Sequence, residues 1–258
     1  MKGEKIHKAK KSLGQNFLKS IPALNKIVEA GEVTLEDVVL EIGPGKGALT
    51  EKLLEKAGKV IAIEKDYELC HLLEEKFRKE IQDQKLILLR EDILEFQVEK
   101  NKPYKIIANI PYNITGAILK KFLTEKNQPK LMVLMIQHEV AKRIVATDGK
   151  ESILSISVKA YGEPKMILKV PARYFSPAPK VDSAVIAIKN ISRQKFEENK
   201  VNEEKFWEIV KKGFAHKRKK LSGNLKGVVD FEFLEKFGDQ RAENLKLVDW
   251  IFLAQESK

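Results

Sequence analysis

Four consecutive residues near the middle of the chain, Asn109-Ile110-Pro111-Tyr112, have the types and the order needed to make a planar amine reactive. An adenine or cytosine NH2 group is a poor nucleophile because its lone pair is delocalised into the ring. The side-chain oxygen of Asn109 and the backbone carbonyl of Ile110 can each accept one N–H of such an amine, which localises the lone pair on nitrogen. Pro111 has no N–H that competes for these acceptors, and Tyr112 can stack on an extruded base. A strand that ends in a proline turn has similar residues, so the rest of the chain must decide.

The segments around this motif alternate between the patterns of buried strands and of helices. Strand patterns occur at residues 38–42, 60–63, 86–89, 105–108, 131–136, 165–170 and 183–188. Helical patterns occur at residues 48–56, 66–80, 115–125 and 152–161. This alternation predicts an α/β fold in which a parallel sheet carries helices on both faces.

The chain changes character after Asn190, where charged helices with aromatic and aliphatic stripes begin. Phe206, Val210 and Phe214 recur at every fourth residue, which is typical of a core-facing helix surface. We therefore expect two domains. Their ranges are 1–189 for the catalytic domain, which includes a basic tail at 1–12, and 190–258 for a small helical domain.

A glycine-rich turn, Gly43-Pro44-Gly45-Lys46-Gly47, follows the strand pattern at 38–42. After the first strand of an open α/β sheet, such a turn binds nucleotide-type cofactors because glycine allows close approach of the backbone. Spacing alone leaves two readings open: Gly-x-Gly-x-x-Ala fits a dinucleotide fingerprint, and Gly-x-Gly-x-Gly fits an S-adenosylmethionine site. No Gly-Lys-Ser/Thr ending is present, which disfavours a P-loop.

Two acidic residues follow the next two strand patterns. Glu64 comes about twenty residues after the glycines, where a carboxylate can accept both hydroxyls of a cofactor ribose. Asp92 follows the strand at 86–89 and could accept a hydrogen bond from a cofactor adenine amine, with Glu91 as a rival for that place. A dinucleotide enzyme has no need of Asn-Ile-Pro-Tyr after the fourth strand, but an amino methyltransferase does. The combination favours S-adenosylmethionine as the cofactor.

Basic residues exceed acidic ones by a formal charge of +11, and the isoelectric point is near 9.4. This excess favours a polyanionic partner, either nucleic acid or an anionic membrane surface, with a lysine-rich solvated surface as the alternative. The charge gathers in the first twenty residues, which include Lys10 and Lys11, and again after residue 210. The second cluster consists of Lys211, Lys212, Lys217, Arg218, Lys219 and Lys220. If that partner is RNA, we expect both clusters to contact its phosphates.

The composition disfavours several other classes of protein. No apolar run approaches the ~18–20 residues that span a bilayer. Cys70 is the only cysteine, which excludes an internal disulfide and fits a reducing cytoplasm. The four histidines are scattered without Cys or carboxylate partners at ligand spacing, so we expect no metal site.

Four motifs together closely resemble those of the ribosomal RNA adenine N6,N6-dimethyltransferase family, specifically its KsgA-like branch. They are Leu13–Leu18, Glu41–Gly45, Asn109–Asn113 and Phe175–Ser183, and the resemblance runs from about Lys11 to about Leu225. It implies a Rossmann-like class I methyltransferase fold with a mostly parallel seven-stranded sheet and a small C-terminal helical domain. It also implies dimethylation of the N6 amines of two adjacent adenosines in a hairpin loop near the 3′ end of 16S rRNA, with S-adenosylmethionine, during small-subunit biogenesis.

The resemblance implies roles for the matching residues. Asn109 would bridge the cofactor and the target amine, beside Ile110 and Pro111. Tyr112 would stack on the target base, with Phe175 as the opposite wall. The cofactor-binding residues would be Gln15, Asn16 and Leu18 over the methionine end, Gly43 and Gly45 beneath it, Glu64 at the ribose, Asp92 at the adenine, and Asn109.

Three alternatives remain open. A member of the same family could methylate an adenosine of large-subunit rRNA, as resistance methyltransferases do. A DNA adenine methyltransferase is disfavoured, because its motif more usually begins with Asp or Asn followed by Pro-Pro. The protein could also act chiefly as an assembly factor that binds immature 30S subunits, with methylation secondary. We expect a cytoplasmic monomer whose partner is small-subunit rRNA and which has no membrane partner.

Overall fold

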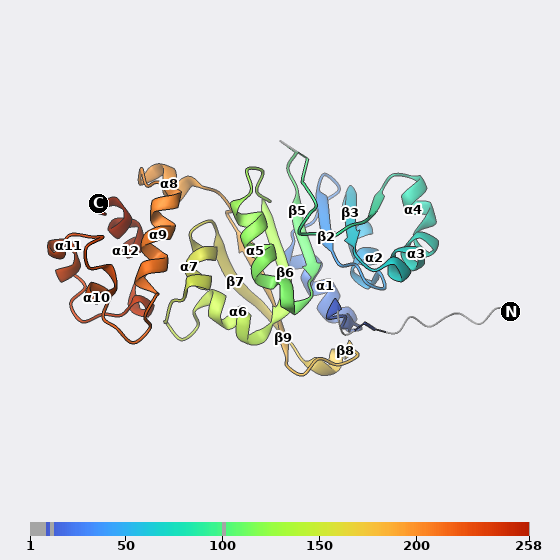
Figure 1. Cartoon of the computed structure of the whole chain (residues 1–258). Coiled ribbons are helices and arrows are strands. Elements are labelled where there is room, and N and C mark those ends of the chain that lie inside the picture. The colour runs from blue at the N-terminus through green and yellow to red at the C-terminus, as the bar shows by residue number, and fades with distance from the viewer. Residues whose placement is uncertain (1–8, 11–12, 100–101, 258) are drawn as a thin grey trace. The chain divides into compact units, whose positions relative to one another are not determined.

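Seven strands form one sheet in the order β4-β3-β2-β5-β6-β9-β7 in the computed structural model of the chain (Figure 1). The structure describes residues 9–10, 13–99 and 102–257. The strands are β2 (Val38–Ile42), β3 (Lys59–Glu64), β4 (Leu86–Arg90), β5 (Lys105–Asn109), β6 (Leu131–Gln137), β7 (Glu163–Val170) and β9 (Ser183–Lys189). Neighbours among β2 to β6 run parallel, whereas β9 runs antiparallel to β6. The mostly parallel α/β fold is therefore confirmed.

The central strands are buried on both faces of the sheet. Val39 of β2 and Ile107 of β5 belong to one core cluster, together with Ile27 and Leu53 from helices on that face. Leu40 follows Val39 in β2 and is equally buried. Successive side chains of a strand point to opposite faces, so both faces must be covered, as parallel sheets require.

Helices connect most of these strands. Those before residue 146 are α1 (Ile21–Ala30), α2 (Ala48–Leu54), α3 (Tyr67–Lys76), α4 (Arg78–Gln82), α5 (Thr115–Thr124) and α6 (His138–Val145). The single helix expected at 66–80 is wrong, because Phe77 leaves the helical conformation (φ −112°, ψ 30°) between α3 and α4. Its ring is buried in the core. The sequence patterns did not predict α1 and α6.

Two short strands join distant parts of the chain. β1 (Phe17–Leu18) pairs antiparallel with β8 (Phe175–Ser176). Next to them, the backbone N–H of Lys19 donates to the carbonyl of Tyr174 at 2.8 Å. This pairing fixes the N-terminal segment, by which we mean the described residues before α1 (9–10 and 13–20), against the loop that contains Pro171, Pro177 and Pro179. Two of the sequence motifs therefore meet in space.

The chain divides into two units. The first contains the residues up to Ala141 and Lys165–Lys189, and the second contains Lys142–Pro164 and the residues from Asn190 onwards. Residues 142–164, which we expected in the catalytic domain, thus belong to the second unit. Aromatic packing is the reason. The ring of Tyr161 stacks on Trp207 with centroids 6.2 Å apart, and Trp207 Nε1 donates to the Tyr161 hydroxyl at 3.2 Å.

The second unit is helical, as expected for the C-terminal region. Its helices are α7 (Ile153–Lys159), α8 (Gln194–Glu198), α9 (Glu203–Gly213), α10 (Leu221–Leu225), α11 (Phe231–Glu235) and α12 (Leu247–Gln255). Phe206 and Val210 of α9 are fully buried, and the ring of Phe214 stacks on Trp250 of α12 at 5.2 Å. The aromatic stripe therefore faces a core.

Gly213 permits the close contact between α9 and α12, and replacing it should weaken this unit. A Cβ atom at Gly213 would lie 2.4 Å from the Trp250 ring, inside a packed core. We expect Gly213→Ala to lower the free energy of unfolding by about 1–3 kcal/mol, although alanine is normally the better helix former. The matched control is Gly223→Ala in α10, where nothing lies within 4 Å of the added Cβ. Urea titration of both variants tests this, and equal stabilities would contradict it.

Candidate active site

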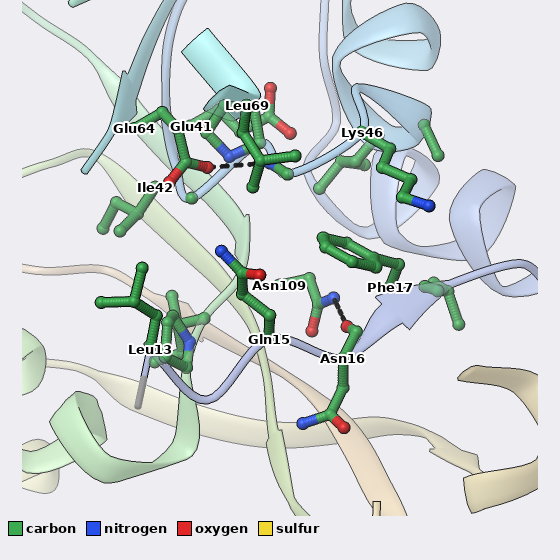
Figure 2. A pocket seen from close by; sticks show the side chains of 18 of the residues that line it. Leu13, Gln15, Asn16, Phe17, Glu41, Ile42, Lys46, Glu64, Leu69 and Asn109 are labelled. Carbon is green, nitrogen blue, oxygen red and sulfur yellow. Dashed lines mark hydrogen bonds between the residues drawn. The ribbon is translucent and has the colours of Figure 1, made fainter. Parts of the chain in front are cut away.

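A cavity of about 820 Å³ lies at the carboxyl edge of the sheet in the first unit. Its walls come from the N-terminal segment, the glycine turn after β2, the ends of β3 and β5, and the segment after β4 (Figure 2). The predicted site residues that line it are Gln15, Asn16, Leu18, Gly43, Gly45, Glu64, Asp92, Asn109, Ile110, Pro111 and Tyr112. The volume is in the range of small-molecule sites.

The glycine turn forms one wall of the cavity. Gly43, Gly45 and Gly47 all have left-handed backbones, with φ of +64°, +61° and +77°. A Cβ atom at Gly45 would lie 3.0 Å from the ring of Phe17, and one at Gly47 would lie 2.5 Å from that of Phe77. Glycine is therefore required both for the turn and for the close packing behind it.

Glu64 ends β3 with only 6% of its surface exposed. Its carboxylate oxygens accept backbone N–H groups from Gly45 at 3.1 Å and from Asp66 at 2.9 Å. Burial raises the pKa of this carboxyl, and the two backbone donors oppose the rise. The group is thus held in one position at the cavity wall, and each oxygen keeps a lone pair for a ligand hydroxyl.

Asp92 lies at the opposite end of this wall, after β4. Its carboxylate accepts hydrogen bonds from Lys65 Nζ at 2.7 Å and from the backbone N–H of Leu94 at 2.9 Å. These bonds, led by the one from Lys65, lower the pKa of Asp92. An ionised acceptor is therefore available here. Glu91 also lines the cavity, so the choice of Asp92 over Glu91 stays a prediction.

Asn109 is the last residue of β5, and its amide has a defined orientation. Nδ2 donates to the backbone carbonyl of Asn16 at 3.3 Å, across 93 positions of the chain (Figure 2). Oδ1 accepts no hydrogen bond from the described residues. Because the donor half is engaged, the amide presents an acceptor to the cavity.

The Tyr112 ring is fixed by a residue that had no role in the sequence-based hypothesis. Its hydroxyl forms a 2.6 Å hydrogen bond with Ser183 Oγ, 71 positions away. Ser183 is fully buried at the start of β9. Burial raises the pKa of Tyr112, so the phenol remains neutral. Ser183 closes the sequence motif Phe175–Ser183, but only the three-dimensional structure reveals its partner.

Phe175, which the sequence-based hypothesis places on the wall opposite Tyr112, does not line the cavity. Its side chain is 3% exposed and belongs to the core cluster that contains Leu18. Ser176, not Phe175, contributes from this strand to the cavity wall. A stacking role for Phe175 would require movement of its ring, so that role stays a prediction.

Two predicted residues of the N-terminal segment have protein partners. Gln15 lines the cavity, but its Nε2 donates to Asp66 at 2.7 Å and its Oε1 accepts the backbone N–H of Lys10 at 2.7 Å. Lys10 was expected to contact RNA, and its Nζ forms a 2.7 Å ion pair with Asp66. Lys11 and the rest of the predicted tail fall among residues 1–8 and 11–12, outside the described residues.

Glu41 is a second buried acid beneath the cavity. It is 1% exposed, and neither its Oε2 nor the hydroxyl of Thr50 has a hydrogen-bond partner among the described residues. Burial raises the pKa of Glu41 to about 8, and the nearby Glu64 carboxylate adds to the rise. At neutral pH this side chain is therefore largely protonated.

The comparisons with known proteins agree on one family. A family model described as ribosomal RNA adenine dimethylase matches residues 6–255. The chain belongs to this family. The matched residues include the whole range of the sequence resemblance, which is thereby confirmed. By family, the protein is an adenine dimethylase of ribosomal RNA.

Relatives of this dimethylase cover almost the whole chain. A Dehalococcoides mccartyi protein named ribosomal RNA small subunit methyltransferase A is 41% identical, over 96% of this chain and 88% of its own. A protein of the same name from Nostoc is 40% identical over 95% of this chain and 96% of its own.

Two solved structures support the same fold. A dimethyladenosine transferase from Plasmodium falciparum superposes with a TM-score of 0.80 at 28% identity, covering 93% of this chain and 96% of its own. The 23S rRNA methyltransferase ErmE gives a TM-score of 0.77 at 24% identity, over 93% and 99% of the two chains. The second likeness bears on the fold alone.

The basic cluster of the dimethylase lies in its second unit. Lys211 and Lys212 are in the last turn of α9, and residues 217–220 form the segment that leads into α10. All six basic side chains are exposed. Asn224 shapes this segment, because its Nδ2 donates to the carbonyls of Gly213 at 2.6 Å and His216 at 3.2 Å.

The part of the chain that the structure describes contains neither a metal-binding cluster nor a membrane-spanning helix. Across 9–10, 13–99 and 102–257, no cluster of three or more His, Cys, Asp or Glu side chains could hold a metal ion. No helix in the same part of the chain has the length and apolar character needed to cross a membrane.

The buried Glu41 should make the stability of the dimethylase depend on pH. Its pKa lies above the usual 4.5, so the folded chain binds this proton more tightly than the unfolded chain. That contribution is complete below pH about 4.5 and is lost as the pH rises through about 8. Between these limits, we expect the free energy of unfolding of wild type to fall by on the order of 2–4 kcal/mol relative to that of Glu41→Gln, at about 1.4 kcal/mol per pKa unit.

Urea titrations at pH 5.5 and pH 8.5 measure this difference. The exposed Glu36→Gln is the control, and its stability should change with pH as that of wild type does. A constant difference between wild type and Glu41→Gln at both pH values would show that Glu41 is ionised throughout.

Proposed function

We propose that this protein dimethylates the N6 amines of two adjacent adenosines in a hairpin loop of small-subunit rRNA, near its 3′ end, with S-adenosylmethionine as the methyl donor. Relatives at 41% and 40% identity carry the name ribosomal RNA small subunit methyltransferase A, which supports the choice of subunit. The solved structure at 28% identity is titled a dimethyladenosine transferase, which supports two methylations of one base. The reaction belongs to the maturation of small subunits in the cytoplasm.

The residues of the cavity fit S-adenosylmethionine chemically. Glu64 offers a fixed, buried carboxylate for the two ribose hydroxyls, and Asp92 an acceptor for the adenine amine. Gly43 and Gly45 leave the backbone open to the ligand. When bound, the cofactor supplies an electrophilic methyl group on a positively charged sulfur.

The chain's own contribution is to orient and polarise the target amine. The Asn109 amide presents Oδ1 because its Nδ2 is bound to the Asn16 carbonyl, and the carbonyl of Ile110 is the second acceptor. Two acceptors draw the two N–H bonds out of the plane of the base and localise the lone pair on nitrogen. Such positioning and preorganised polarity supply most of the acceleration expected of a site like this.

Proton removal needs no dedicated base. As the nitrogen bonds to the methyl carbon, the carbon–sulfur bond of the donor would break and its electron pair would stay on sulfur. The alkylated nitrogen would be strongly acidic, so it gives up one proton to an acceptor or to water. One N–H remains after the first transfer, and the same acceptors can hold it for a second round. The Tyr112 ring, tethered by Ser183, would stack on the base that leaves its helix, at a cost of a few kcal/mol.

The orientation of the Asn109 amide is the observation that carries this proposal. The decisive experiment incubates the protein with unmethylated small subunits and labelled S-adenosylmethionine, and then maps the modified nucleotides. Label on two adjacent adenosines of the small subunit is expected. Label in large subunits would support the resistance-type alternative, and binding of immature subunits without label would support a pure assembly factor.

Asn109→Ala should abolish methyl transfer without disturbing RNA binding. Loss of the acceptor removes polarisation of the amine, and we expect a fall of at least about 10²–10³-fold in kcat. Labelled methyl incorporation measures the activity, and filter binding measures RNA affinity. Thermal unfolding serves as the check that the variant folds. Turnover at the wild-type rate would exclude the proposed role of Asn109.

The exposed segment Lys217–Lys219 should contribute to RNA affinity through phosphate contacts. Replacing its three cations with glutamine should weaken binding and flatten the plot of log K against log salt by about 0.7–0.9 per lost phosphate contact. The control replaces Lys56, Arg78 and Lys79, which are exposed and do not line the cavity. Both triple variants lose the same charge, so equal salt slopes would show that Lys217–Lys219 is solvated surface only.

A further inference from the structure

We propose that Asp66 is a positioning residue that joins the two walls of the cavity and holds Asn109 in its acceptor orientation through the N-terminal segment. It acts with Lys10 and Gln15, and we call these three side chains the Asp66 clasp. The inference rests on the proposed function, since it concerns the same cavity. It assigns a role to an acid that touches neither the target amine nor the methyl donor.

Both carboxylate oxygens of Asp66 bind the N-terminal segment. Oδ1 accepts from Lys10 Nζ at 2.7 Å, and Oδ2 accepts from Gln15 Nε2 at 2.7 Å. The Asp66 side chain is fully buried in this contact, whereas that of Lys10 is 39% exposed. Burial alone would raise the pKa of Asp66, but the bonds from Lys10 and Gln15 outweigh it and the pKa is lowered. The clasp therefore holds an ionised carboxylate.

Gln15 also forms a hydrogen bond within the N-terminal segment. Its Oε1 accepts the backbone N–H of Lys10 at 2.7 Å, and the carbonyl of Lys10 accepts the N–H of Leu13 at 3.1 Å. The amide is thus engaged at both ends. Because the donor and the acceptor of the Gln15 amide are both bound to protein, its main effect is on the conformation of the segment, and any effect on a ligand is secondary.

The segment continues directly to the Asn109 contact. Asn16 follows Gln15, and its carbonyl accepts Asn109 Nδ2 at 3.3 Å. Its own side chain donates to the carbonyl of Gly14 at 3.1 Å. Gly14 has a left-handed backbone (φ +66°), and a Cβ there would lie 3.3 Å from Asn113. This short run of chain is therefore closely fitted between Asp66 and the Asn109 motif.

Asp66 also belongs to the opposite wall. Its backbone N–H donates to Glu64 at 2.9 Å, and its side chain caps α3 by accepting the N–H of Glu68 at 3.0 Å. The residue that fixes the ribose carboxylate thus also anchors the segment that orients Asn109. Release of the clasp should loosen the cofactor wall and Asn109 together.

The charges around the clasp explain why Lys10 is a poor phosphate ligand. Its Nζ faces Asp66 and, at 3.5 Å, Glu68. An ammonium group shared between two carboxylates must give up these contacts to bind RNA. Lys10 and the exposed lysines of the second unit are therefore expected to differ in function.

Asp66→Asn and Lys10→Met test the clasp. Asparagine keeps the acceptor that caps α3, and methionine keeps much of the Lys10 stem, so both variants should fold. Loss of a charged hydrogen bond should weaken binding of S-adenosylhomocysteine about tenfold, measured by calorimetry. Backbone amides of residues 13–18 should exchange hydrogen about tenfold faster in the ligand-free protein. The kcat at saturating cofactor and RNA should also fall, because Asn109 loses its fixed orientation.

The control and the double variant separate this role from others. Lys26→Met removes an exposed surface ion pair with Glu29 and should change none of these quantities. Asp66→Asn combined with Lys10→Met should cost no more than either change alone. An altered RNA salt slope in Lys10→Met with unchanged exchange and cofactor affinity would overturn the clasp in favour of a phosphate contact. If wild type fails to bind S-adenosylhomocysteine, the proposed function falls, while the exchange rates still decide whether the clasp exists.

Discussion

The site depends on the parallel direction of four neighbouring strands. β4, β3, β2 and β5 lie side by side with the same polarity, so their carboxyl ends share one edge. The chain adds β3 and β4 on one side of β2 and then crosses to place β5 on the other. Ligands bind at such a reversal because the connections diverge there and leave a crevice. Glu64 and Asn109, which end β3 and β5, consequently flank the glycine turn that follows β2.

Two buried acids at this edge, Glu41 and Glu64, are both costly to ionise. Both side chains are largely withdrawn from water, and the Glu64 carboxylate adds to the raised pKa of Glu41. Glu64 has backbone donors from Gly45 and Asp66, whereas Oε2 of Glu41 has no partner among the described residues. The backbone donors therefore favour the charged form of Glu64 and oppose the rise in its pKa that burial causes. At Glu41, burial and the Glu64 carboxylate outweigh the opposing effects of Thr50 and Lys76, and the pKa is raised.

Local patterns predicted the sheet because its central strands are buried on both faces and their sequences are mostly apolar. They failed where tertiary contacts decide. Phe77 interrupts a periodic helical pattern because its ring is buried in the core. Residues 142–164 belong to the second unit because Tyr161 packs against Trp207. The motifs located the cavity, but the partners Lys10–Asp66 and Tyr112–Ser183 are 56 and 71 positions apart. No spacing rule indicates such pairs, and burial of Phe175 likewise follows only from the pairing of β1 with β8.

The interior of the protein, and not only the substrate, determines that residue 109 is asparagine. A carboxylate at this place could accept an N–H from an amine as well as an amide can. It could not donate to the Asn16 carbonyl, which lies 3.3 Å from Nδ2, and two acceptors at that distance repel each other. An amide has a donor NH2 group and an acceptor oxygen on the same rigid plane, so a hydrogen bond from the NH2 group orients the oxygen. The hydrogen bond to the N-terminal segment therefore selects one of the two orientations of the Asn109 amide, and this selection does not require substrate.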